Sequence, residues 1–387
     1  MHRSEQPRLP RILGLWLALL GLAGTAAAGT PLPVPEPPAV SARSYILIDY
    51  HSGRVLAEHD ADRPVEPASL TKLLTAYVVF HELAEGRLSP QTPVTISEKA
   101  WRMPGSRTFV EVGHKVPVET LLKGMIIQSG NDATVALAEQ VAGSEETFAA
   151  LMNQYAARLG MTASHFVNST GLPAPEHRTT ARDLAILTRA LIRDFPQYYP
   201  LYSEKRFTWN EITQYNRNKL LWRDETVDGV KTGHTESAGY CLVSSAERDG
   251  MRLIAVVLGD RSEDARAASS QALLNYGFRF FESHRLYAGG EALQTVPVYR
   301  GEADEVAAGL REDLWVTFPR GARDRLQAAA EVPGHVLAPV HEDQELGTLE
   351  VRLGDELLAS RPLVALAAVA EGAWWKRLLD DARLWFE

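Results

Sequence analysis

The period of the hydrophobic residues changes twice along the chain, and this change limits the fold more than any other feature. Ser44–Asp49 and Val55–Glu58 have the pattern of two strands joined by a turn. Helical spacings of three and four then recur in Leu70–Leu83, Val118–Gln128, Ala133–Val141, Thr147–Leu159 and Ala181–Arg193. Strand-like segments return in Val227–Thr232, Tyr240–Ala246 and Arg252–Leu258, and a helical pattern follows from Asp264 to Phe281. Strands on both sides of a helical block predict an α+β unit over residues 44–286, with one mixed sheet and helices packed around it.

A second unit follows the pair Gly289-Gly290, where the apolar segments become shorter. These segments are Thr295–Tyr299, Leu314–Phe318, Val336–Val340, Leu349–Leu353 and Leu357–Leu363. Leu349–Leu353 alternates strictly, and Gly354-Asp355 supplies a hairpin turn directly after it. The sequence therefore predicts a small all-β domain over residues 287–367.

The first 28 residues have the pattern of a secretory signal peptide. Three arginines among the first eleven residues precede the apolar run Ile12–Leu22, and Ala26–Ala28 supplies a small-residue cleavage site. The run is shorter than the roughly 20 residues of a membrane span, which favours cleavage after Ala28 over a membrane-anchoring helix. Prolines crowd the next segment and predict an extended tether over residues 29–43. We therefore expect the protein to work outside the cytoplasm.

The composition excludes several classes of function. Lys and Arg number 40 against 49 Asp and Glu, a net charge of −9 without a basic cluster, so we expect no nucleic-acid partner. Cys241 is the only cysteine, so neither an internal disulfide nor a Cys-based metal cluster can form. The 11 histidines have no H-E-x-x-H or comparable spacing, which leaves a metal-dependent peptidase without support. We expect no metal and no cofactor.

The first candidate cluster is Pro67–Lys72, immediately before an apolar helical stretch. Three residues separate Ser69 from Lys72, so in the first turn of a helix both side chains would lie on one face. A lysine desolvated in a closed cleft can take the proton of a neighbouring hydroxyl and activate it as a nucleophile. Taken alone, a serine at this place would be read as a helix-capping residue.

The second cluster, Ser129-Gly130-Asn131, lies between two helical patterns. The glycine permits a sharp turn, so Ser129 could pass a proton to a leaving amine while the Asn131 amide holds a substrate carbonyl. Alone, the segment would be an ordinary helix junction with Asn131 or Asp132 as the N-cap.

The third cluster, Lys231–Thr235, ends a strand pattern. Lys231 offers a positive charge and Thr232 a hydroxyl for a carboxylate. Gly233 lets a ligand approach the backbone and pair with it as an added strand. Alone, this cluster would be a strand that ends in a glycine turn.

The three clusters follow one another in the order S-x-x-K, S-x-N and K-T-G, each in the context that this arrangement requires. Further matching segments are Gln128–Asp132, Asn216–Asn218, Asp228–Thr235 and Gly277–Glu282. The chain resembles the penicillin-binding proteins and serine β-lactamases, and within them the low-molecular-mass D-alanyl-D-alanine carboxypeptidases of Gram-negative bacteria. The resemblance runs from about residue 41 to the C-terminus. It implies a penicillin-binding, β-lactamase-like transpeptidase fold followed by the all-β domain.

The resemblance also implies a role for each polar residue. Ser69 would be the acylated nucleophile, Lys72 its general base and Ser129 the proton relay, while Lys231 and Thr232 would bind the terminal carboxylate.

The backbone N–H groups of Ser69 and His234 would form an oxyanion hole. Arg266, and in second place Arg217, would add positive charge around the carboxylate. Each arginine could instead form a structural salt bridge.

The C-terminal residues 368–387 predict an amphipathic helix. At 100° per residue its apolar side chains cover an arc of about 140°, opposite every charged residue. These apolar side chains are Trp374, Trp375, Leu378, Leu379, Ala382, Trp385 and Phe386. Such a helix is too short to span a bilayer and suited to its interface, and related carboxypeptidases use a tail of this kind as a peripheral anchor. Acidic residues balance its basic ones, so attraction to anionic lipid should be weak. The alternative is a helix docked on its own β domain or on a second subunit.

We therefore expect a periplasmic enzyme, peripheral on the outer face of the inner membrane. It would remove the terminal D-Ala from peptidoglycan pentapeptides through an acyl-enzyme, and β-lactam antibiotics would inhibit it. A β-lactamase would need a deacylating base, and no Glu-x-x-Leu-Asn segment follows Ser129, where Thr179–Asp183 opens a helix instead. A third hypothesis, a cell-wall scaffold with a degenerate site, is disfavoured because every polar group of the three clusters is intact.

Overall fold

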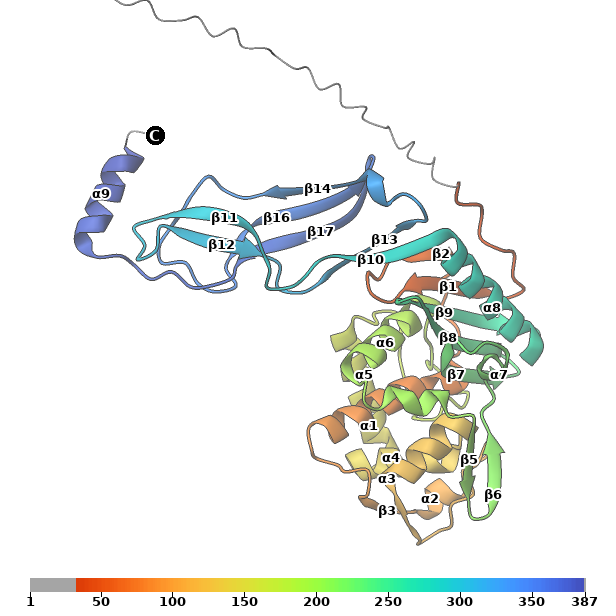
Figure 1. The fold of residues 1–387 in the computed structure, drawn as a ribbon. Helices are drawn as coiled ribbons and strands as arrows, with labels where there is room; N and C mark the ends of the chain where they lie inside the picture. The colour runs from red at the N-terminus through yellow and green to blue at the C-terminus, as the bar shows by residue number, and fades with distance from the viewer. Residues whose placement is uncertain (1–32, 386–387) are drawn as a thin grey trace, which may run out of the picture.

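The computed structural model describes residues 33–385 of the chain, and Figure 1 shows its fold. The predicted signal peptide and the first residues of the predicted tether lie outside the described residues. The rest of the tether has no regular secondary structure. The Pro35 carbonyl accepts a hydrogen bond of 3.0 Å from the Tyr276 hydroxyl, and Ser41 Oγ donates to Asp260 Oδ1 at 2.6 Å. These bonds hold the tether against the folded unit.

Five antiparallel strands form the sheet of the first unit in the order β2-β1-β9-β8-β7. Their bounds are β1 Ser44–Asp49, β2 Val55–His59, β7 Val227–Thr235, β8 Gly239–Arg248 and β9 Met251–Asp260. In the turn between β8 and β9, Asp249 and Gly250 have φ values of 51° and 79°, the backbone that a two-residue hairpin of this twist requires. The predicted strand segments and hairpin are confirmed.

Helices cover both faces of this sheet, as Figure 1 shows. One face packs against α8, Glu263–Phe280, and the other against a helical block built around α1, Lys72–Ala84. Further helices of this unit are α2 Glu98–Trp101, α3 Val118–Lys123, α4 Asn131–Ala142, α5 Glu145–Leu159, α6 Ala181–Asp194, α7 Leu220–Arg223 and a 3₁₀ turn, Tyr199–Ser203. Strands β3 Pro93–Thr95 and β4 Lys115–Pro117 form an antiparallel pair, and β5 Arg206–Trp209 and β6 Ile212–Tyr215 form a hairpin. Most of α1 is buried, so its N-terminal end is fixed beside the edge strand β7.

Two helices differ from the sequence pattern, and both differences lie at candidate site residues. A one-turn 3₁₀ helix, Ala68–Thr71, precedes α1, so Ser69 lies in that turn and Lys72 opens the α-helix. The pattern over Val118–Gln128 is α3 followed by a π-turn, Gly124–Gln128, because the Ser129 N–H donates to the Gly124 carbonyl five residues earlier. Such wide turns are frequent at functional sites.

The second unit is all-β, as predicted. Its main sheet has the strand order β14-β16-β17-β12-β11-β15, and a separate pair joins β10 to β13. The bounds are β10 Phe281–Tyr287, β11 Ala292–Tyr299, β12 Glu305–Gly309, β13 Leu314–Pro319, β14 Leu326–Glu331, β15 Val336–Leu337, β16 Glu345–Leu353 and β17 Glu356–Ala365. Because β10 pairs along its length with β13, the expected boundary between residues 286 and 287 falls inside this strand.

The two units meet through specific contacts. The His51 ring stacks on Trp315 with centroids 4.0 Å apart, and Arg54 pairs with Glu356 at 2.6 Å. Ser52 Oγ lies 2.6 Å from the Thr317 hydroxyl. A stacked ring pair together with an ion pair fixes how the β domain is attached to the sheet.

The predicted C-terminal helix is present as α9, Trp374–Leu384, at the end of the β domain far from the first unit (Figure 1). Its charged face contacts the β domain: Asp380, 3% exposed, accepts a 2.7 Å bond from the Arg300 N–H, and Lys376 pairs with Asp304 at 2.7 Å. Its apolar face points outward, with Trp374 70% and Leu378 62% exposed. Within residues 33–385, no helix is long and apolar enough to cross a membrane.

Candidate active site

A cleft of about 380 Å³ opens between the start of α1, the end of the π-turn and the edge strand β7. Its lining residues come from distant parts of the chain and are Ser69, Gly105, Ser106, Ser129, Arg217, Thr232, Gly233, His234, Tyr240, Glu263 and Arg266. Each of the three predicted clusters contributes to this list. The fold therefore brings them together.

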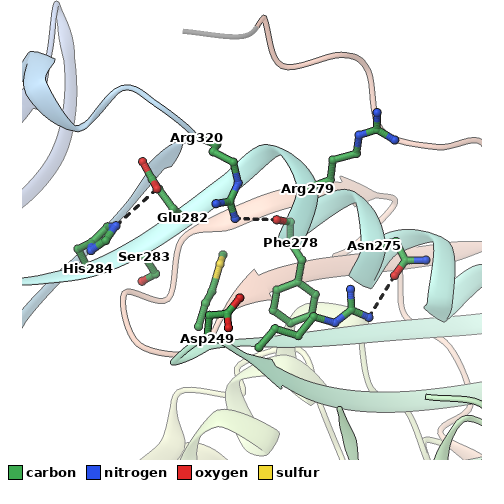
Figure 2. A pocket seen from close by; sticks show the side chains of 10 residues that line it. Asp249, Asn275, Phe278, Arg279, Glu282, Ser283, His284 and Arg320 are labelled. Atoms are coloured by element: carbon green, nitrogen blue, oxygen red, sulfur yellow. Dashed lines mark hydrogen bonds and ion pairs between the residues drawn. The ribbon is translucent and has the colours of Figure 1, made fainter. Parts of the chain in front are cut away.

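A larger cavity, of about 580 Å³, lies between the β8–β9 turn, the end of α8 and β10 (Figure 2). Its polar groups bind one another: Arg248 contacts Asn275 at 3.1 Å and Arg320 donates to the Phe278 carbonyl at 2.9 Å. None of the predicted site residues lines it. We therefore place the site in the smaller cleft.

Ser69 and Lys72 meet as their spacing predicts. Lys72 Nζ lies 3.2 Å from Ser69 Oγ, and the lysine side chain is almost completely buried. Nζ also donates to Asn131 Oδ1 and to the Thr170 carbonyl, both at 2.7 Å. The nucleophile and its candidate base are thus in direct contact.

The hydrogen bonds of Lys72 show how it can act as a base. Burial, and next the charge of Arg217, lower the pKa of Lys72 to about 7. A neutral amine has two N–H groups and one lone pair, and the oxygens of Asn131 and Thr170 can only accept. Both N–H groups are therefore used on these acceptors, and the lone pair is left for the Ser69 hydroxyl.

Asn131 is oriented by its surroundings. Its side-chain Nδ2 donates to the Pro104 carbonyl at 2.6 Å, and its backbone N–H donates to the Ser106 carbonyl at 2.7 Å. Because Nδ2 is engaged there, Oδ1 is directed at Lys72.

Ser129 follows the π-turn in the left-handed region, with φ 67° and ψ 31°. Its Oγ accepts a 3.0 Å hydrogen bond from Lys231 Nζ, which also donates to the Thr232 carbonyl at 2.9 Å. Gly130 is required here, because a Cβ would lie 2.0 Å from Thr108 Oγ1. Burial, and next the charge of Lys72, lower the pKa of Lys231 well below its ordinary value.

β7 lies at the edge of the sheet and forms one wall of the cleft. The strand continues through Gly233, which pairs with Cys241, so the glycine does not end it. A Cβ at Gly233 would lie 3.3 Å from Ala68 Cβ, so a glycine there allows close packing on the turn that holds Ser69. The His234 ring stacks on Tyr240 with centroids 4.0 Å apart.

The two arginines differ in their contacts. Arg266 is buried, donates to the Gly233 carbonyl at 3.1 Å and lies over the Tyr240 ring, 5.6 Å from its centroid. Arg217 lines the cleft and makes no hydrogen bond or ion pair with any other residue in the range 33–385. The structural salt bridge considered for Arg217 is therefore not formed within the described residues.

Several contributors were not found from the sequence. Gly105, Ser106, Tyr240 and Glu263 line the cleft, and Thr170 acts through its backbone carbonyl. Every residue has a backbone carbonyl, so the sequence does not indicate which carbonyl takes part in a site. The loop that carries Gly105 and Ser106 has no periodic pattern. The Tyr240 ring could have been suspected, since Tyr240 opens a predicted strand and pairs with His234 of the third cluster.

Comparison with known proteins agrees with this geometry. The family profile of D-alanyl-D-alanine carboxypeptidase matches residues 33–262, and that of the penicillin-binding protein 5 C-terminal domain matches residues 281–371. The chain belongs to the D-alanyl-D-alanine carboxypeptidase family. The predicted family, its penicillin-binding-protein fold and its class of enzyme are thereby confirmed.

Relatives cover nearly the whole chain. D-alanyl-D-alanine carboxypeptidase DacA of Escherichia coli is 42% identical over 361 residues, which cover 91% of this chain and 90% of the relative. DacC of the same organism is 44% identical over 359 residues, with the same two coverages. The alignments therefore include both units.

Solved structures of the family have the same fold. Penicillin-binding protein 5 of Haemophilus influenzae is 39% identical and has a TM-score of 0.84 over 87% of this chain and 100% of its own. Penicillin-binding protein D2 of Listeria monocytogenes, solved in an ampicillin-bound form, is 29% identical and has a TM-score of 0.58 over 63% of this chain and 100% of its own. Within residues 33–385 of this carboxypeptidase, no group of three or more His, Cys, Asp or Glu side chains could hold a metal ion.

Proposed function

We propose that this carboxypeptidase removes the terminal D-Ala of peptidoglycan pentapeptides with Ser69, Lys72 and Ser129 as its catalytic residues. The observation that carries the proposal is the contact of Lys72 Nζ with Ser69 Oγ at 3.2 Å, with both lysine N–H groups used elsewhere. A neutral amine in this position accepts the hydroxyl proton as Ser69 attacks.

The reaction then proceeds in two halves. Ser69 Oγ forms a bond to the carbonyl carbon of the penultimate D-Ala, and its proton passes to Lys72 Nζ. The peptide C–N bond breaks, and the leaving amine takes a proton from the Ser129 hydroxyl, which regains one from the protonated Lys72 Nζ; Lys231 Nζ contacts Ser129 Oγ at 3.0 Å. Water then attacks the ester, Lys72 Nζ accepts a proton from the water, and this proton passes to Ser69 Oγ as the ester C–O bond breaks.

The backbone N–H groups of Ser69 and His234 are proposed to stabilise the oxyanion. The extended β7 edge around Gly233 supports this role, because a substrate peptide can pair there as an added strand.

The terminal carboxylate is proposed to bind Lys231, Thr232, Arg217 and Arg266. Three of these are cations. Besides burial, the charges of Arg217 and Arg266 lower the pKa of Lys231, and the charge of Arg217 lowers the pKa of Arg266, because like charges repel. An arriving carboxylate relieves this repulsion and favours the charged form of Lys231. Asn131 is proposed to hold a substrate carbonyl through its amide.

Covalent binding of penicillin follows from the same chemistry, since a strained amide beside a carboxylate can acylate Ser69. An opened β-lactam stays attached and obstructs the approach of water, whereas D-Ala departs. The lining of the cleft contains one carboxylate, that of Glu263, which lies 3.4 Å from Lys219 and 4.0 Å from Arg266 and is therefore paired with cations. This arrangement disfavours the β-lactamase alternative.

One preparation tests the proposal. We expect many turnovers of D-Ala release from a peptide that ends in D-Ala-D-Ala, much slower turnover of penicillin, and an acyl-enzyme trapped at Ser69 by peptide mapping. Ser69→Ala should abolish labelling by a fluorescent penicillin. Penicillin hydrolysis faster than D-Ala release would identify a β-lactamase. A wild-type protein with neither activity would favour the cell-wall scaffold with a degenerate site.

We further propose that residues 1–28 direct export to the periplasm, residues 29–43 form a tether, residues 44–286 are the catalytic domain and residues 287–367 the β domain. The pairing of β10 with β13 moves the boundary between these two domains to the start of β10. Residues 368–387 are proposed to attach the enzyme to the outer face of the inner membrane. The outward apolar face of α9 supports attachment, and its charged face, used on the β domain, argues against the alternative in which the apolar face docks there.

A further inference from the structure

His177 is not among the residues that line the cleft, and the proposed mechanism gives it no role. It is 3% exposed and belongs to a loop closed by the paired backbones of His165 and Arg178. The same loop supplies the Thr170 carbonyl to Lys72. The loop therefore packs against the 3₁₀ turn that carries Ser69.

The hydrogen bonds of the His177 ring fix its tautomer. The Val167 N–H donates to Nδ1 at 3.0 Å, and Nε2 lies 2.9 Å from Thr71 Oγ1. A backbone N–H can only donate, so Nδ1 accepts and the proton of the neutral ring is on Nε2. Burial keeps the ring neutral by lowering the pKa of His177 to about 4. Nε2–H therefore donates to the Thr71 hydroxyl.

The Thr71 hydroxyl links the His177 ring to the 3₁₀ turn that carries Ser69. Because its oxygen accepts from Nε2–H, its own hydrogen is free to donate to the Ala68 carbonyl, at 2.9 Å. Ala68 has a positive φ of 48°, a backbone that an alanine rarely adopts without support from its surroundings. Gly171 packs so closely over the same carbonyl that a Cβ there would lie 1.7 Å from its oxygen.

A trans peptide is planar, so its N–H points opposite to its C=O. The Ala68 carbonyl belongs to the peptide whose nitrogen is that of Ser69. The Thr71 hydroxyl and Gly171 fix the position of the Ala68 carbonyl, and this position sets the direction of the Ser69 N–H, the proposed oxyanion donor.

We propose that Val167, His177 and Thr71 form a hydrogen-bond relay that orients the Ala68–Ser69 peptide, with His177 as a positioning residue. This inference rests on the proposed function, because it assigns a purpose to the relay through the Ser69 N–H. The relay touches neither substrate nor reacting atoms. It should act on the acylation step and leave the binding of the ligand before acylation almost unchanged.

The test measures the dissociation constant and the acylation rate constant of a fluorescent penicillin separately, by stopped flow, for the full chain. Thr71→Val keeps the shape and removes the hydroxyl, and His177→Phe removes both ring hydrogen bonds. We expect each to slow acylation about tenfold to a hundredfold, since loss of an oxyanion donor costs about 10²–10³. The dissociation constant should change less than threefold.

His177→Gln is the rescue variant, because its amide can accept from Val167 and donate to Thr71. It should acylate much faster than His177→Phe. Thr188→Val is the matched control: Thr188 is buried, and its hydroxyl donates to the Leu184 carbonyl at 2.7 Å inside α6. It should lower the melting temperature without slowing acylation. The double variant of Thr71→Val with His177→Phe should be no slower than Thr71→Val alone, because the relay runs through Thr71.

Normal acylation by Thr71→Val and His177→Phe would overturn the relay, as would a Gln variant no better than Phe, or a control that slows acylation equally. A wild-type chain that is not acylated at Ser69 would overturn the proposed function and the relay together. The two failures are distinguished by the wild-type measurement.

Discussion

The cleft and helix α9 depart from the usual division between a polar surface and an apolar interior, in opposite directions. Beside the cleft, Lys72 and Lys231 are 1% and 3% exposed, and within residues 33–385 neither forms an ion pair with a carboxylate. In α9, the apolar side chains Trp374 and Trp385 are 70% and 89% exposed. Charge is inside in one region, and apolar surface is outside in the other.

Both departures identify what a partner must supply. A buried lysine is costly in its charged form unless an anion pairs with it, and the substrate carboxylate is proposed to pair with Lys231. An exposed apolar face is costly unless it is covered, and a lipid interface provides that cover. Hydrogen bonds nearby hold both regions in place: Lys72 donates to Asn131 beside the cleft, and the Arg300 N–H donates to Asp380 on the charged face of α9.

The largest effect should come from breaking the buried-charge region at Lys72. Lys72→Ala removes the proposed base, and we expect acylation of Ser69 by penicillin to slow about 10²–10⁴-fold. Lys99→Ala, which removes a surface lysine paired with Glu146, is the control and should leave the rate unchanged. A near-normal rate for Lys72→Ala would show that another group activates Ser69.

Next in size is the effect of breaking the exposed apolar region. Leu378→Glu combined with Leu379→Glu should weaken binding to zwitterionic lipid vesicles at least about a hundredfold, since burial of the two leucines together contributes about 3–6 kcal/mol. Activity on a small peptide should not change, because α9 lies at the end of the β domain far from the catalytic unit (Figure 1).

Leu357→Glu is the matched control for that experiment, because Leu357 is a half-exposed leucine on β17. It should bind vesicles like the wild type. A full-length protein that does not sediment with vesicles at all would contradict the anchor and favour contact with a second subunit.

The smallest expected effect is the pH dependence of kcat/KM, which should follow the titration of the buried Lys72. With a Lys72 pKa of about 7, the neutral fraction falls as the pH drops, so kcat/KM should fall about tenfold per pH unit below 7 and level off above it. The charge of Arg217 helps to lower this pKa, so in Arg217→Ala the fall of kcat/KM should begin at a higher pH. A fall that begins at the same pH in this variant, or one that begins near pH 10 in the wild type, would exclude Lys72 as the base.

The sequence predicted the parts of the site that depend on spacing. Ser69 and Lys72 were placed on one face from a separation of three, and this holds even though Ser69 lies in a 3₁₀ turn. The meeting of the three clusters in one site came from the motif order and the resemblance. The α+β core followed from hydrophobic periodicity, which reports burial directly.

The remainder depends on tertiary contacts that residue identity does not encode. The π-turn before Ser129 arises where Gly124 packs against the Thr108 side chain, far away in the sequence. The Thr170 carbonyl and the His177 ring reach the nucleophile turn through a loop without any period. In α9 the amphipathic pattern predicted two faces, but which face meets the β domain depends on the backbone N–H of Arg300.

The β domain separates α9 from the catalytic unit, as Figure 1 shows. Its strands β16 and β17 contain 9 and 10 residues, and each therefore spans roughly 30 Å. With α9 in the headgroup layer, the cleft would work at a set height above the bilayer, about one strand length or more. The stacking of His51 on Trp315 would then keep the catalytic unit at that height. The length of the β domain would thus determine which stem peptides, by their distance from the membrane, can reach the cleft.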